Sequence, residues 1–214
     1  FLHTLSLHDA LPIYVVASAV GSLSNPTRLS NTFKSVKGLK VKNETISSYL
    51  DCFIDAYIIS KSYRYDIKGR SYIDTPLKYY FTDIGLRNAR LNFRQQEENH
   101  IMENIIYNEL IAREFNVDVG VVEYNHKDDS GKKVRTQLEV DFVVNKTEKR
   151  YYIQSALTVS DEDKRRQEVN SLNKIDDSYA KIVVVRDNIL PWRDEKGVLY
   201  INIEDFLLEK INEL

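Results

Sequence analysis

The chain has 214 residues, of which 43% are hydrophobic and 29% charged, so it is long enough and apolar enough to bury a core. Its single cysteine, Cys52, excludes an internal disulfide and favours a reducing, cytoplasmic location; its apolar neighbours predict that it is a core residue. No apolar run reaches the roughly 18 residues that cross a bilayer, which excludes a membrane-spanning class.

The first 13 residues, FLHTLSLHDALPI, contain no Lys or Arg and show no clear helical or strand period. They resemble translated sequencing-adapter read-through. A signal peptide is the alternative, because Leu11–Val16 is apolar and Ala17-Ser18-Ala19 resembles a cleavage site, but the positive segment is missing. We therefore treat residues 1–13 as non-native.

The net charge of −2 hides an asymmetry between two parts of the chain. Residues 14–95 carry 13 Lys and Arg against 6 Asp and Glu, whereas residues 96–214 carry 17 against 25. This shift in charge predicts two domains, residues 14–95 and 96–214. The basic domain is suited to bind the phosphates of a nucleic acid. Ordinary surface charge is the alternative.

Residues 14–95 predict three helices followed by a hairpin. The helices are expected at 14–22, 26–36 and 43–55, with Asn25 as N-cap and Pro26 at the first position of the second, and Asn43 capping the third. Strands at 56–66 and 71–81 flank the basic turn Ile67–Arg70. This order is typical of a winged helix-turn-helix, with 43–55 as its recognition helix.

Two groups of residues are therefore expected to contact DNA. Small hydroxyl side chains of the recognition helix are suited to phosphates or base edges, and cations of the hairpin to phosphates. These residues are Thr45, Ser47 and Ser48 on the helix, and Lys61, Arg64, Lys68 and Arg70 on the hairpin. Because the helix contains no Lys or Arg, a protein-docking role is the alternative.

Residues 96–214 predict a second α/β domain. A helix at 97–115, following a connecting one at 83–90, precedes strands at 117–124, 134–145 and 150–159. A helix at 161–175, a buried strand at 182–185, a strand at 198–203 and a helix at 204–211 follow. The order α-β-β-β-α-β is that of the PD-(D/E)xK restriction-endonuclease-like fold.

Strand alternation predicts where the polar residues of this domain meet. Leu138, Val140, Phe142 and Val144 should share one face, Glu139 and Asp141 the other, and Tyr152, Gln154 and Ala156 a common face. In a hairpin Asp141 and Gln154 then converge, with Glu103 of the preceding helix as a third oxygen. A charged, solvated strand face is the alternative.

The chemistry expected of a group formed by Asp141, Gln154 and Glu103 is metal-dependent cleavage of a phosphodiester. Mg²⁺ is usually held by one or two carboxylates plus substrate phosphate, for which Asp141 and Glu103 are the candidates. A nearby Lys would stabilise charge in the transition state. Here Gln154 stands where a carboxylate is needed and Ala156 where the Lys is needed, so the catalytic group Glu103, Asp141 and Gln154 is degenerate.

Residues 14–214 resemble the C-terminal region of a large bacterial and archaeal group of AAA-type ATP-binding proteins. The resemblance rests on four stretches: LKYYFTDIGLRN (Leu77–Asn88), MENIIYNEL (Met102–Leu110), EVDFV (Glu139–Val143) and YIQ (Tyr152–Gln154). It implies a winged helix, a nuclease-like domain of unknown function and an upstream ATPase module as partner. Since G-x-x-x-x-G-K-[ST] does not occur here, ATP would bind only in that module.

Our leading hypothesis is a DNA-binding regulatory module with little or no cleavage activity. An active Mg²⁺-dependent nuclease with a Lys supplied from elsewhere is the first alternative. A protein-interaction module of the ATPase is the second, which the absence of basic residues in 43–55 favours.

Overall fold

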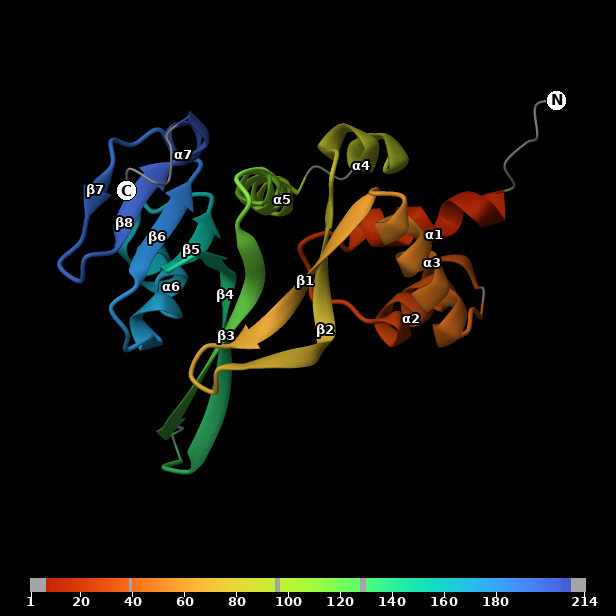
Figure 1. Ribbon diagram of the computed structural model, residues 1–214. Helices are drawn as coiled ribbons and strands as arrows, with labels where there is room; N and C mark the ends of the chain where they lie inside the picture. Colours follow the sequence, from red (N-terminus) through yellow and green to blue (C-terminus); the bar gives the residue numbers. More distant parts are fainter. Residues whose placement is uncertain (1–6, 39, 95–96, 128–129, 209–214) are drawn as a thin grey trace. The chain divides into compact units, whose positions relative to one another are not determined.

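The computed structural model describes residues 7–38, 40–94, 97–127 and 130–208 (Figure 1). Over these ranges the chain is a mixed α/β protein with seven α-helices and one eight-stranded sheet, which confirms the mixed α/β class expected from the sequence. The strand order is β2-β1-β3-β4-β5-β6-β8-β7. None of the helices in the described ranges has the length and hydropathy of a membrane span.

Contacts divide the chain into two compact units. The first unit comprises Phe1–Ser62 and Asp74–Asn104, and the second Tyr63–Ile73 and Ile105–Leu214. This division departs from the predicted boundary after residue 95 in two places, because the first unit extends to Asn104 and the tip of the β1–β2 hairpin belongs to the second unit. There Arg64 to Asp66 of β1 pair in parallel with Val119 to Val121 of β3.

The helices and the hairpin of the N-terminal half have these bounds: α1 Leu7–Ser18, α2 Pro26–Lys37, α3 Asn43–Asp55, β1 Ile59–Asp66, β2 Ser71–Phe81 and α4 Ile84–Arg90. The N-cap of α2 is the one predicted. The Asn25 side chain accepts a hydrogen bond from the Arg28 amide at 2.8 Å, and Gly38, with φ of 67°, donates to the Lys34 carbonyl.

The prediction for the start of α3 was wrong at one residue. Lys42 occupies the N-cap position, and Asn43 lies inside the helix, where its side-chain amide donates to the Thr27 hydroxyl at 3.1 Å. A partner on another helix therefore outcompetes the local cap. The prediction that Cys52 is a core residue was also wrong, because its side chain is exposed.

The core of the first unit combines one face of each of the first three helices with β1, β2 and the end of α4. Its buried residues are Ile13, Val15, Val16, Ala17, Val20, Leu29, Phe33, Ile46, Leu50, Ile59, Tyr79, Phe81 and Leu91. Arg87 of α4 is also buried; its Nε donates to the Ala17 carbonyl at 3.2 Å, and burial lowers the pKa of its guanidinium.

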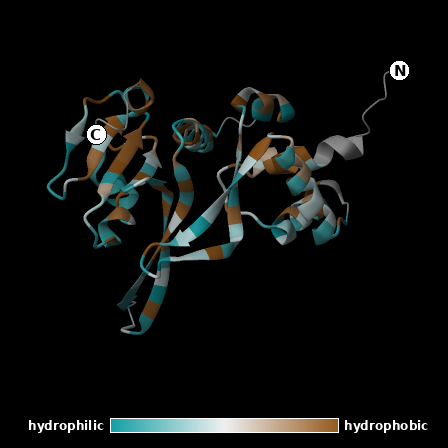
Figure 2. Ribbon diagram, viewed as in Figure 1, coloured by the Kyte–Doolittle hydropathy of each residue, from teal (hydrophilic) through white to brown (hydrophobic). Residues whose placement is uncertain are grey.

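The elements of the C-terminal half have these bounds: α5 Glu98–Ala112, β3 Asn116–Lys127, β4 Lys133–Lys146, β5 Lys149–Ala156, α6 Glu162–Glu168, a 3₁₀ turn Leu172–Lys174, β6 Ala180–Val185, β7 Trp192–Arg193, β8 Leu199–Asn202 and α7 Ile203–Leu208. Strands β3, β4 and β5 pair antiparallel in succession, whereas β6 pairs in parallel with β5 and β8. The expected buried strand 182–185 is thus central, as the hydropathy of β6 indicates (Figure 2). The predicted long helix after β5 is instead the short α6 and the 3₁₀ turn.

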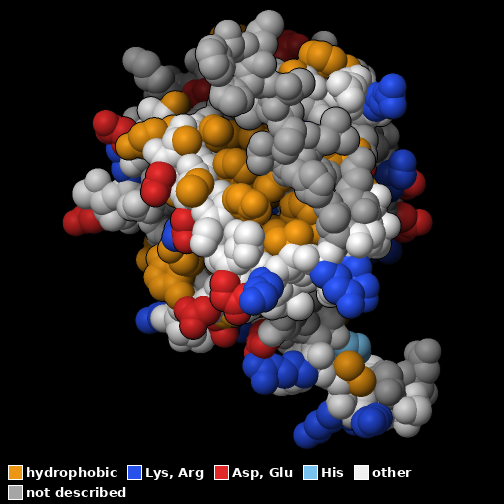
Figure 3. Space-filling model, turned by 90° about the vertical axis from the view of Figure 1, so that its right-hand side faces the viewer, with side chains coloured by type: hydrophobic (Ala, Val, Ile, Leu, Met, Phe, Trp, Pro, Cys, Tyr) orange, Lys and Arg blue, Asp and Glu red, His pale blue; other side chains and the backbone are white. Residues whose placement is uncertain are grey.

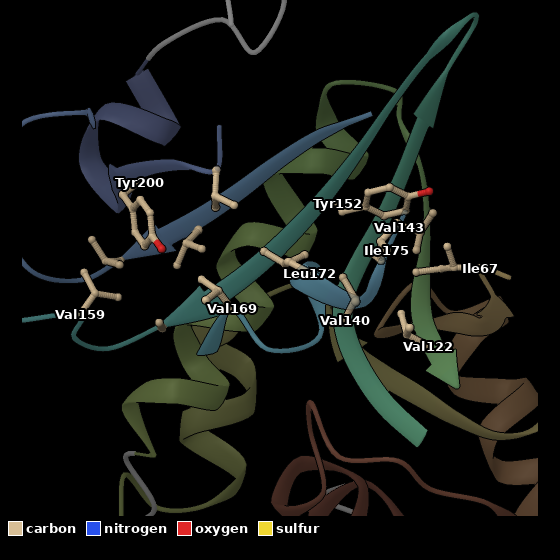
Figure 4. Close-up of a cluster of buried hydrophobic side chains, with 14 residues drawn as sticks. Ile67, Val122, Val140, Val143, Tyr152, Val159, Val169, Leu172, Ile175 and Tyr200 are labelled. Carbon is tan, nitrogen blue, oxygen red and sulfur yellow. The ribbon is translucent and has the colours of Figure 1, made fainter. Parts of the chain in front are cut away.

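One face of this sheet is covered by α6 and the 3₁₀ turn. Val169, Leu172 and Ile175 from that segment pack against Val140 and Tyr152 of the strands (Figure 4). The exclusion of water from this cluster fixes which side chains of β4 and β5 point inward, and thereby constrains the candidate site.

Candidate functional site

The sheet of the second unit forks between β4 and β5. Their antiparallel ladder runs from Lys146 paired with Lys149 to Phe142 paired with Ile153 and stops there. Beyond that pair β4 continues alongside β3, as the hairpin at the bottom of Figure 1, whereas β5 continues alongside β6. Asp141 and Gln154 are the next residues of the two strands, so both lie at the fork.

Two hydrogen bonds join Asp141 of β4 to β5 at the fork, one to Gln154 and one to Ser155. The Asp141 carboxylate, which is buried, accepts from the Ser155 amide with a distance of 2.8 Å from Oδ2. The Asp141 amide donates to Gln154 Oε1 at 3.4 Å. The structure therefore brings these two predicted residues together, and side chains replace the main-chain ladder where the strands separate.

The predicted alternation of β4 was wrong across this site, because the strand contains a β-bulge. Asp118 pairs with Val143 but Gly120 pairs with Val140, so one residue of β3 faces two of β4, Asp141 and Phe142. The bulge places Val140 and Val143 in the same apolar cluster, although their spacing of three predicts opposite faces (Figure 4). Asp141 is thus positioned by an irregularity rather than by regular pleating.

Ala156, at the position where a nuclease site needs Lys, is part of the apolar core. Its exposed fraction is 4%, and it belongs to the same cluster as Val183 and Val185 of β6. A methyl group here fills space between strands, and it supplies no charge to the fork.

Glu103 belongs to the first unit, whereas Asp141 and Gln154 belong to the second. It is buried, and its Oε1 accepts from Lys78 Nζ at 2.8 Å and from the Tyr80 hydroxyl at 2.6 Å. The next residue, Asn104, hydrogen-bonds both the amide and the carbonyl of Phe81, at 2.8 and 2.7 Å. These contacts attach the start of α5 to β2, so Glu103 has a structural role in its own unit.

Mg²⁺ fits poorly with the residues at the fork. The donors there are one carboxylate that already accepts a main-chain hydrogen bond and one neutral amide oxygen. Within the described ranges no group of three or more His, Cys, Asp and Glu side chains is arranged to hold a metal. We therefore assign no reaction step to a metal at this site.

The exposed side of α3 is acidic. Thr45 and Ser48 are exposed and Ser47 is half-buried, and the Ser48 hydroxyl donates to the Glu44 carbonyl of its own helix. The exposed positions of this helix also include three carboxylates, Glu44, Asp51 and Asp55, and no cation. Phosphate would be repelled by this surface.

The hairpin cations differ in their surroundings. Lys68 and Arg70 are exposed on the turn, which is held by Asp66: its Oδ1 accepts from the amides of Lys68 and Gly69 at 3.1 and 2.9 Å. A Cβ on Gly69 would lie 2.5 Å from Asp66 Oδ2, so a larger residue there would displace the carboxylate that holds the turn. Arg64 donates to Gln137 Oε1 at 3.4 Å, and Lys61 is exposed in the first unit.

Sequence reasoning missed a cavity of about 510 Å³ between α6 and the β7–β8 strands. There Trp192 stacks on Tyr200, with ring centroids 4.2 Å apart, and Arg165 Cζ lies 5.7 Å from the Trp192 ring. Burial, aided by Asp194, raises the pKa of Tyr200 to about 12. The two-residue strand β7 carries too short a pattern to be predicted, although the lone Trp is a signal.

Two comparisons with known proteins gave matches. Residues 13–97 match a family model described as a domain of unknown function, DUF8612. The chain is also similar to a protein of Haemophilus influenzae (strain ATCC 51907 / DSM 11121 / KW20 / Rd) that is described as uncharacterized. The two are 31% identical over 197 residues, which is 92% of this chain and 45% of the relative. The chain thus spans about half the length of this relative. No solved structure matches.

Proposed function

We propose that this chain is a nucleic-acid-binding module that does not cleave its ligand and that acts within a longer ATP-binding protein. In this proposal the first three helices and the β1–β2 hairpin form a winged helix, and α5-β3-β4-β5-α6-β6 form a nuclease-like domain. The order of the elements supports both assignments. The greater length of the Haemophilus relative leaves room for a separate ATPase module.

The hydrogen bonding of Asp141 is the observation that carries the proposal. In a metal-dependent nuclease the carboxylates of the site hold the cation, and a Lys stabilises the developing charge. Here Asp141 instead closes the gap between β4 and β5 by accepting from the Ser155 amide. With Ala156 buried in apolar surroundings, the same strands support a fold but lack a catalytic set.

Binding is assigned to cations of the hairpin and not to α3. Lys68 and Arg70 lie at an exposed turn whose main chain is fixed by Asp66, so both side chains are available to phosphate oxygens. The three exposed carboxylates of α3 oppose the role of recognition helix. This assignment keeps the predicted ligand and the predicted hairpin contacts Lys68 and Arg70, and it drops the contacts predicted for α3.

The test is to incubate the protein with labelled duplex, single-stranded and branched DNA in the presence of Mg²⁺ or Mn²⁺. We expect binding that weakens steeply as salt increases, and no cleavage beyond that given by Asp141→Asn, which retains an acceptor oxygen for Ser155. Metal-dependent cleavage that Asp141→Asn abolishes would instead establish an active nuclease with a Lys from elsewhere. Absent or salt-insensitive binding to all three DNAs would refute the proposal.

A protein-docking role for α3 is the second candidate, and its acidic exposed side favours it. Tyr49 is also partly exposed on this helix, beside Glu44, Asp51 and Asp55. The variant Glu44→Gln/Asp51→Asn/Asp55→Asn removes three negative charges without changing side-chain size. If α3 docks a protein, DNA affinity should change less than about twofold, since the helix then lies away from phosphate. A large gain in DNA affinity would place α3 at the DNA and contradict docking.

A further inference from the structure

Beyond the fork, β3 and β4 continue as a two-stranded ribbon that we call the arm, comprising residues 123–127 of β3 and 133–137 of β4. In this part of the strands β4 pairs only with β3, since its ladder with β5 has ended. Figure 1 shows the ribbon extending away from the other strands of its own unit, and Figure 2 shows it to be largely hydrophilic. The arm therefore contributes little to the core.

The register of the arm places its cations on one face. Asn125 pairs with Arg135 and Lys127 pairs with Lys133, and directly opposed residues of an antiparallel pair share a face. Lys127, Lys133 and Arg135 are all exposed. Figure 3 shows Lys and Arg side chains gathered over the arm, at the lower right of the view.

The pairing of Lys127 with Lys133 is unfavourable by itself. Like charges directly opposite one another destabilise an antiparallel pair. Nearer the fork the ribbon compensates its charge, because Arg135 forms an ion pair with Glu123, which also accepts from Gln137 at 2.7 Å. Neither Lys127 nor Lys133 has an ion-pair partner among the described residues. An anionic ligand along this face would relieve the repulsion.

The opposite face of the arm is half-buried at Tyr124 and exposed at His126. Tyr124 and His126 stack with ring centroids 5.1 Å apart, and Lys174 Nζ lies 4.9 Å from the centre of the Tyr124 ring. The cations of the two strands lie on the other face, which is therefore the face suited to an anionic ligand. A two-stranded ribbon has dimensions that the major groove of a duplex admits, and phosphates border that groove on both sides.

We infer that the cationic face of the arm binds the phosphate backbone of duplex DNA through Lys127, Lys133 and Arg135. This inference rests on the proposed function and adds a second DNA contact to the unit that already contains Lys68 and Arg70. Lys127 and Lys133 are the test positions, because removing Arg135 would leave Glu123 without its partner.

The experiment measures the affinity for a labelled 20-base-pair duplex, about two helical turns, by fluorescence anisotropy between roughly 50 and 200 mM salt. Each phosphate contact contributes about 0.9 to the slope of log affinity against log salt. Lys127→Gln/Lys133→Gln should therefore lower the slope by about 2, so the loss of affinity over this range becomes about tenfold smaller. Lys149→Gln/Lys164→Gln removes the same charge at exposed positions outside the arm and should leave the slope unchanged.

Four outcomes decide the inference. A reduced slope in the arm variant alone, with an unchanged or higher melting temperature, supports it. Equal slopes for the two double variants, with DNA binding by the parent, would overturn the inference and leave the proposed function standing. No binding by the parent would overturn both. If the arm variant loses affinity only for a single-stranded 20-mer run in parallel, the assignment to duplex is wrong.

Discussion

Replacing Lys78 by Met tests whether Glu103 serves the structure of the first unit. Lys78 Nζ lies 2.8 Å from Glu103 Oε1, and the two side chains are only 3% and 9% exposed, so the ion pair is shielded from solvent and salt. Lys78→Met keeps most of the apolar stem but leaves the Glu103 carboxylate buried with the Tyr80 hydroxyl. Removing one partner of a buried ion pair typically costs about 3–5 kcal/mol.

The expected loss of stability is large because the Lys78–Glu103 ion pair is buried. The assay is equilibrium unfolding in urea, monitored by circular dichroism. A loss of about 3–5 kcal/mol corresponds to roughly 6–20 °C in melting temperature for a chain of this size. Lys34→Met, the same change at an exposed position of α2, should shift stability by less than about 0.5 kcal/mol. The double variant Lys78→Met/Glu103→Leu should recover much of the loss, because no charge then remains buried.

A different result would refute this reasoning. If Lys78→Met changed the free energy of unfolding by less than about 1 kcal/mol, the ion pair would not be a structural element of the unit. Glu103 would then be open again to the role in a metal site that its sequence position suggested.

Three further predictions concern the second unit. The change Gln154→Glu/Ala156→Lys restores the residue types of a nuclease motif but buries a Lys against Val183 and Val185, so we expect loss of stability in thermal melts and no cleavage of labelled DNA; metal-dependent cleavage would contradict this. Gly120→Ala places a Cβ 2.8 Å from Val143 Cγ2 and 2.9 Å from Val140 Cβ at the bulge and should cost about 1–3 kcal/mol in urea unfolding; a neutral result would mean that the bulge relaxes freely. Burial raises the pKa of Asp118, with the Tyr72 hydrogen bond opposing the shift, so the folded state binds more protons than the unfolded state and stability falls as pH rises from about 4 toward the raised pKa. Asp118→Asn removes this dependence. Unfolding curves across that range should show that the free energy of unfolding of the variant increases relative to that of the parent as pH rises. A difference that stays constant with pH would contradict the prediction.

Local signals made much of the fold predictable. Asn25, Pro26 and Gly38 delimit α2 because each acts on its own neighbours in the chain, and the bounds of β2 followed from its composition and the adjacent basic turn. Asn43 carries the same kind of signal, but Thr27 on another helix takes its side chain, and no local rule reveals that competition.

The candidate site was predictable only where it depends on residues of neighbouring strands. The meeting of Asp141 and Gln154 followed from two adjacent strands of a hairpin, and the structure places them within hydrogen-bonding distance. The bulged strand itself contains no glycine, since its sequence there is Val140-Asp141-Phe142-Val143, and the glycine at the bulge, Gly120, lies on the partner strand β3. The placement of Glu103 depends on Lys78 and Tyr80, which are more than 20 residues away in sequence.

The fork between β4 and β5 also has a consequence for self-association. Where β4 departs, β5 presents the kind of unpaired main-chain edge that other chains add to in aggregates. The Asp141 carboxylate accepts a hydrogen bond from the Ser155 amide at this edge, and it places a negative charge beside the strand. Asp141→Ala, the substitution normally chosen to inactivate a nuclease, would expose the edge, so oligomers or precipitation in that variant would report an unprotected strand and not a lost catalyst.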